Sequence, residues 1–113
     1  LYRLGWVADI PGADNFLYIL LHSSQIGSAG NYSGFTDPEF DRLVSEARLS
    51  IDTAHRIELY QQADRLATEA ACWIMYAYPM QRILFNPDYE GLVMPLQGDF
   101  RIPLEKLRLK NEI

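Results

Sequence analysis

The chain has 113 residues, of which 49% are hydrophobic and 22% charged, with a formal net charge of −5 and a sequence pI near 4.8. This composition excludes a disordered or fibrous chain, and the length allows one domain at most. An acidic chain whose only lysines are Lys106 and Lys110 is unsuited to neutralising phosphates, which excludes nucleic acid as a partner.

The apolar run from Leu1 to Ala8 predicts a strand that needs partners on both sides. The chain starts with leucine and shows no leader segment, so we expect it to be a piece of a longer protein, with residues 1–113 forming a single fragment. A Pro-Gly turn follows, in which Asp14 or Asn15 can cap a short helix. That helix, Phe16 to Leu21, is apolar on nearly every side and far shorter than the roughly 20 residues that cross a bilayer.

A polar, glycine-rich loop from Ser23 to Gly34 precedes two predicted helices. Thr36 and Glu39 have capping-box spacing and predict a helix that ends near Leu49. Its apolar face comprises Phe40, Leu43, Val44 and Ala47. A second helix follows Asp52 or Thr53, with a stripe of Ile57, Tyr60, Ala63, Ala67 and Ala70 and an ion pair between Arg65 and Glu69. Together they predict a helical hairpin laid on a sheet.

Beyond Trp73 the pattern favours extended chain. Strands are predicted over residues 73–78, 82–86, 89–94 and 104–109. The fold class expected from these elements is α/β, a helical hairpin packed on a small mixed sheet.

No pattern in the sequence indicates an enzyme. His22 and His55 lie too far apart for the usual zinc spacings, and Gly27-Ser28-Ala29-Gly30 lacks the lysine of a phosphate-binding loop. The lone cysteine, Cys72, is expected to be a buried small hydrophobe. We therefore predict no catalytic residue, no metal site and no cofactor.

Asp9 is the carboxylate that stands out, because it ends a strand of bulky apolar residues. A carboxylate at a cleft edge can pair with an ammonium group, and the preceding strand can offer its backbone to an extended ligand. The alternative is that Asp9 caps the following turn through its own backbone. The local sequence leaves both interpretations open.

Four segments occur in a specific order along the chain. They are Gly5-Trp6-Val7-Ala8-Asp9-Ile10-Pro11-Gly12-Ala13-Asp14-Asn15-Phe16-Leu17, Asn31-Tyr32, Asp37-Pro38-Glu39-Phe40-Asp41-Arg42-Leu43 and Arg56-Ile57-Glu58-Leu59-Tyr60-Gln61-Gln62-Ala63. This order resembles the C-terminal part of the family 5 extracellular solute-binding proteins, which include the oligopeptide- and dipeptide-binding proteins of ABC importers. Many members have Tyr-Pro-Asp-Pro after the aspartate, where this chain has Ile10-Pro11-Gly12-Ala13.

The resemblance implies the C-terminal portion of a periplasmic-binding-protein-like (type II) lobe in a two-lobed receptor. It implies that Asp9 pairs with the α-ammonium group of a ligand and that Gly5 and Val7 bind the ligand's backbone. Trp6 would point to the opposite side as a core or cleft-wall residue. The glycine-rich loop that ends at Asn31-Tyr32 would also face the cleft, with Asn31 as a ligand-binding residue.

The function expected from the resemblance is a non-catalytic receptor in the periplasm or outside the cell. It would bind a peptide or other small amine-bearing solute and deliver it to an ABC permease in the membrane. One alternative is an effector-sensing domain of a cytosolic transcriptional regulator with the same fold, and another is a structural or dimerising domain. The isolated fragment is also expected to self-associate through exposed apolar surface, for example at Phe16 to Leu21.

Overall fold

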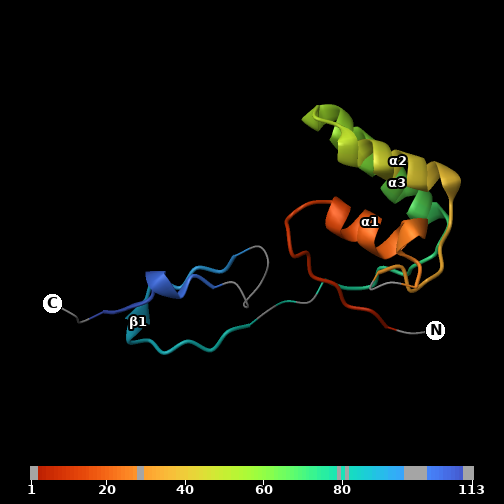
Figure 1. The fold of residues 1–113 in the computed structure, drawn as a ribbon. Helices are drawn as coiled ribbons and strands as arrows, with labels where there is room; N and C mark the ends of the chain where they lie inside the picture. The colour runs from red at the N-terminus through yellow and green to blue at the C-terminus, as the bar shows by residue number, and fades with distance from the viewer. Residues whose placement is uncertain (1–2, 28–29, 79, 81, 96–101, 111–113) are drawn as a thin grey trace. The chain divides into compact units, whose positions relative to one another are not determined.

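The computed structural model describes residues 3–27, 30–78, 80, 82–95 and 102–110 (Figure 1). The chain divides into two compact units, residues 1–76 and residues 77–113. The described part of the first unit is mainly helical, and that of the second is mainly extended chain with one small sheet.

The helices of the first unit lie close to where the sequence predicts them. They are α1 (Asp14–Leu21), α2 (Pro38–Leu49) and α3 (Thr53–Glu69), with a short 3₁₀ turn, η1 (Ser23–Gln25), after α1. The predicted helical hairpin is therefore confirmed as α2 and α3.

The start of α2 differs from the prediction by one residue. Asp37, not Thr36, is the N-cap, and its carboxylate accepts the backbone N–H groups of Glu39 and Phe40, both at 2.9 Å. Pro38 occupies the first helical position, where its fixed φ suits the helix and its missing N–H leaves no donor unpaired. The residue just before Pro38 therefore becomes the cap.

Asp52 caps α3 by accepting the N–H groups of Ala54 and His55. The buried face of α3 consists of Leu59, Ala63 and Ala67. The predicted stripe was wrong at two positions, because Ile57 is 51% exposed and Ala70 is exposed. The predicted pair of Arg65 and Glu69 is not among the ion pairs formed by the described residues.

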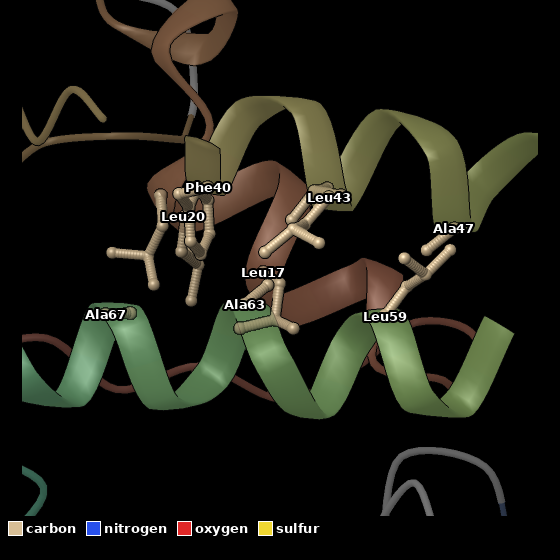
Figure 2. Close-up of a cluster of buried hydrophobic side chains, with 10 residues drawn as sticks. Leu17, Leu20, Phe40, Leu43, Ala47, Leu59, Ala63 and Ala67 are labelled. Atoms are coloured by element: carbon tan, nitrogen blue, oxygen red, sulfur yellow. The ribbon is translucent and has the colours of Figure 1, made fainter. Parts of the chain in front are cut away.

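The core of the first unit lies between the three helices, as Figure 2 shows. The predicted face of α2 is confirmed: Phe40, Val44 and Ala47 are fully buried and Leu43 nearly so. Phe40 lies at the same end as Ala67, so α2 and α3 run antiparallel (Figure 2). Within this unit the hairpin packs on α1 and not on a sheet.

Helix α1 uses its apolar residues to cover the hairpin. Leu17, Leu20 and Leu21 are buried, while Phe16 remains 41% exposed. Neither Asp14 nor Asn15 caps the helix, whose N-cap is Ala13 without a side-chain hydrogen bond. Most of the apolar face expected to drive self-association is therefore already covered within the chain.

The second unit holds a two-stranded antiparallel sheet among its described residues. Strand β1 (Tyr89–Glu90) pairs with β2 (Arg108–Leu109), with Tyr89 opposite Leu109, and a 3₁₀ turn, η3 (Leu104–Lys106), precedes β2. The expected mixed sheet was wrong in this respect. Residues 82–86 and the described residues of 73–78 form no strand, and Pro79 lies outside the described residues.

The described part of the chain thus combines three α-helices with a two-stranded antiparallel sheet. Among the described helices, none has the length and apolar character needed to cross a membrane.

Candidate ligand-binding site

The predicted site begins with the segment that leads into α1. Leu1 and Tyr2 lie outside the described residues, and residues 3–8 form no strand. Their backbone N–H and C=O groups make no hydrogen bond with the rest of the described chain. The predicted strand was therefore wrong for the described residues: this segment forms no strand, and its backbone groups have no partner among the described residues.

Side chains alternate along this segment as they do along a strand. Leu4 and Trp6 are half-buried and pack against the helical core. Gly5 and Val7 are exposed, Val7 to 51%. Trp6 thus points away from the side that Gly5 and Val7 present, in agreement with the alternation that the sequence indicated.

Asn15, in the first turn of α1, holds the end of this segment. Its Oδ1 accepts the indole N–H of Trp6 at 3.1 Å and the backbone N–H of Asp9 at 3.2 Å. The sequence suggested Asn15 as a possible helix cap, but the side chain reaches back to the preceding segment instead. A hydrogen bond between residues nine positions apart has no signal in the local sequence.

The carboxylate of Asp9 is free of contacts within the described chain. Asp9 is exposed, and its carboxylate oxygens accept no hydrogen bond and form no ion pair with the described residues. The alternative that Asp9 caps the following turn is therefore not realised. An exposed carboxylate beside outward-facing Gly5 and Val7 can accept hydrogen bonds from a ligand's ammonium group.

A polar cluster anchors α1 to the other helices. Asp14 Oδ1 lies 2.8 Å from Arg48 Nε and accepts the Tyr60 hydroxyl at 3.3 Å. The Arg48 guanidinium also lies 3.6 Å from the centre of the Tyr18 ring. Burial, followed by the charge of Asp14, raises the pKa of Tyr60 to about 12. A hydrogen bond from the Ser24 hydroxyl lowers the pKa of Tyr18.

Asn31 lies in the interior of the loop, where it cannot face a ligand. It is 2% exposed, and its side-chain nitrogen lies within hydrogen-bonding distance of the carbonyl oxygens of Leu21 (3.0 Å), His22 (3.2 Å) and Phe35 (2.8 Å). Its Oδ1 accepts the Ser33 hydroxyl at 2.9 Å. Because the side chain is fully used in closing the loop, we assign it a structural role instead of the predicted ligand contact.

A second group has the residue types of a hydrolase triad, but its histidine carries the proton on the wrong nitrogen. The group consists of His22, Ser45 and Asp41. His22 Nε2 lies 3.1 Å from the Ser45 hydroxyl oxygen, and Nδ1 lies 3.8 Å from Asp41. Nδ1 accepts the backbone N–H of Ser24 at 3.1 Å. In neutral His22 the proton therefore sits on Nε2 and points toward Ser45, so the ring cannot take a proton from that hydroxyl. The group joins α1 to α2 and is not a nucleophilic site.

Metal and thiol chemistry find no support in the part of the chain that the structure describes. No three described His, Cys, Asp or Glu side chains lie close enough together to hold a metal ion. Cys72 is half-buried, and burial raises the pKa of its thiol, which disfavours the reactive thiolate. Ser28 and Ala29, in the glycine-rich loop, lie outside the described residues.

Comparison with known proteins finds relatives that share a small part of their length with this chain. Di/tripeptide-binding protein 4 of Pseudomonas aeruginosa is 40% identical over 83 residues, which is 74% of this chain and 15% of that protein. Heme-binding protein A of Haemophilus influenzae is 37% identical over 89 residues, covering 79% of this chain and 16% of that protein. The periplasmic oligopeptide-binding protein of Salmonella typhimurium is 30% identical over 112 residues, covering 96% of this chain and 18% of that protein. No family model and no solved structure matches.

These relatives define the class: the chain is homologous to a segment of solute-binding proteins, which are not enzymes. Within that class the chain belongs to the family 5 solute-binding proteins, which include the di- and oligopeptide-binding proteins of ABC importers, so the family that the sequence resembled is confirmed. Relatives named as periplasmic agree with the predicted location. The chain spans less than a fifth of the length of these relatives.

Proposed function

We propose that this chain is part of the solute-binding component of an ABC import system. The complete receptor binds peptides or similar amine-bearing solutes and delivers them to a membrane permease, without covalent chemistry and without a cofactor. Relatives named for binding dipeptides, tripeptides and oligopeptides support this proposal.

The proposed site is the segment from Gly5 to Asp9. Asp9 pairs with the ligand's ammonium group, and the backbone groups of Gly5 and Val7 bind the ligand's main chain by strand addition. The observation that carries the proposal is the Asp9 carboxylate, exposed and without a partner among the described residues, next to backbone groups that are also unpaired. Trp6 contributes from the opposite side by packing the segment on the helices.

The chain is proposed to complete the C-terminal lobe of a two-lobed receptor, in which the hairpin of α2 and α3 lies against a sheet. The small share of each relative's length that the chain covers supports this part of the proposal. So do the apolar side chains exposed in the described part of residues 74–85, among them Ile74, Met75, Tyr78 and Leu84. These residues would be buried by strands from the remainder of the receptor.

Calorimetry on the complete receptor tests the role of Asp9. We expect Asp9→Asn to weaken binding of a peptide with a free N-terminus by about 2 kcal/mol or more, roughly 30-fold, because the ammonium group loses its counter-charge. Asp64→Asn, which removes a carboxylate from the exposed side of α3, is the matched control and should leave the affinity unchanged. Equal affinities of wild-type and Asp9→Asn receptor would refute the ammonium role.

A further inference from the structure

Asn15 joins two points of the proposed binding segment to α1 through a single atom. Its Oδ1 accepts both the Trp6 indole N–H and the Asp9 backbone N–H. Both partners can only donate, so the oxygen of the amide, and not its nitrogen, must face them. One side-chain oxygen therefore links the position of the Trp6 ring to that of the Asp9 main chain.

The position of this oxygen is itself fixed by the helical core. Asn15 is the second residue of α1, and its backbone N–H donates to the Gly12 carbonyl at 3.3 Å. The same helix is held by its buried leucines and by the contact of Asp14 with Arg48. The position of Asn15 Oδ1 is thus set by the packing of α1.

Asn15 contacts the main chain of Asp9 and not its side chain. No described residue hydrogen-bonds the Asp9 carboxylate, so the region that it can reach is set by the position of the backbone that carries it. That backbone is held on one side by Asn15, and Trp6 is held by the same atom three residues earlier. With both bonds made, Trp6 packs against the helices while Gly5, Val7 and Asp9 remain exposed.

We propose that Asn15 is a positioning residue for amine recognition. Its side chain fixes the main chain that carries the Asp9 carboxylate and the backbone groups of Gly5 and Val7, and it does not itself contact the ligand. This inference rests on the proposed function of Asp9. It adds that a residue of α1, which does not touch the ligand, contributes to the receptor's preference for a free amine.

Two substitutions separate positioning from a general structural role. Asn15→Ala removes the acceptor, while Asn15→Asp keeps an oxygen that can accept both N–H groups. In the complete receptor we expect Asn15→Ala to weaken binding of a free-amine peptide roughly tenfold, because displacement of a recognition group costs affinity even when the group is retained. Binding of the same peptide with an acetylated N-terminus should change less, so the preference for the free amine falls. Asn15→Asp should restore most of that preference.

The indole N–H resonance of Trp6 provides a readout that does not depend on ligand. In Asn15→Ala this signal should move and exchange faster with solvent, and in Asn15→Asp it should stay protected. The thermal stability of each variant, measured alongside, identifies a change caused by unfolding.

The outcomes distinguish the two proposals. A wild-type receptor with no preference for the free amine overturns the proposed function and this inference with it. A wild-type preference that survives Asn15→Ala, in a folded variant whose Trp6 signal has moved, overturns the positioning role alone. An equal loss in Asn15→Ala and Asn15→Asp, with the Trp6 signal intact in the latter, contradicts it as well.

Discussion

The two units of this chain use apolar residues in opposite ways. In residues 3–76 the helices bury Phe40 and Val44 completely, whereas in residues 77–110 Tyr78 is 97% exposed and Leu84 is fully exposed. A helix satisfies its backbone hydrogen bonds within itself, so α1, α2 and α3 can pack once they form. An extended segment needs neighbouring strands for its hydrogen bonds. The helical part of the chain therefore carries its own core, and the described residues of the extended part contribute none of the buried cluster.

The largest expected effect comes from removing a side chain at the centre of the helical core. Phe40→Ala should destabilise the first unit by about 3–5 kcal/mol, because it removes buried surface and leaves a cavity. Leu84→Ala, at a fully exposed position, should change stability by less than about 0.5 kcal/mol in the isolated chain. Denaturant unfolding followed by helical circular dichroism measures both. Similar losses for the two variants would contradict the contrast between the units.

A smaller effect is expected at the start of α2. Asp37→Ala should cost about 1 kcal/mol, because the N–H groups of Glu39 and Phe40 lose their acceptor. Thr36→Ala is the control, since the structure gives this residue no capping bond, and it should alter the midpoint of unfolding far less. A larger loss of stability for Thr36→Ala than for Asp37→Ala would show that Thr36 caps the helix, as the capping-box spacing predicted.

The smallest effect is a loss of stability at alkaline pH. The pKa of Tyr60 is raised to about 12 from its usual 10.0, so the folded state holds this proton more tightly than the unfolded state. The stability contributed by Tyr60 is complete below about pH 10 and is lost as the pH rises toward about 12. Tyr60→Phe should show less of this loss than wild type. Tyr18, whose pKa is lowered, acts in the opposite direction and is present in both proteins, so the difference between them isolates Tyr60.

The sequence predicted the helices well because their signals are local. The apolar face of α2 was found residue by residue, and Leu49 was found as its end. The cap was misplaced by one residue, because capping-box spacing outweighed the position that Pro38 imposes on Asp37. For α3, the predicted apolar stripe included Ile57 and missed Leu59. The structure shows that the face packed in the core is the one that contains Leu59.

The strands and the site depended on contacts that the local pattern does not contain. Residues 73–78 and 82–86 carry strand-forming side chains, yet no partner within the described chain pairs with them. Asn31 is a polar residue in a glycine-rich loop, which suggested a ligand contact, but its side-chain nitrogen donates to carbonyl oxygens at the end of α1, those of Leu21 and His22. The bonds of Asn15 likewise span six and nine residues. The local sequence singled out Asp9, and the family resemblance implied its role in binding an ammonium group. The structure adds the hydrogen bond from its backbone N–H to Asn15.

The most direct test of the binding segment is residue-resolved hydrogen exchange of the complete receptor, with and without a peptide ligand. Successive backbone N–H groups of an extended segment point to opposite edges, so a ligand that adds as a strand contacts alternate residues. We expect peptide to slow exchange at Gly5 and Val7 much more than at Trp6. Unchanged exchange at Gly5 and Val7 in a receptor saturated with peptide would show that this segment is not a wall of the binding site.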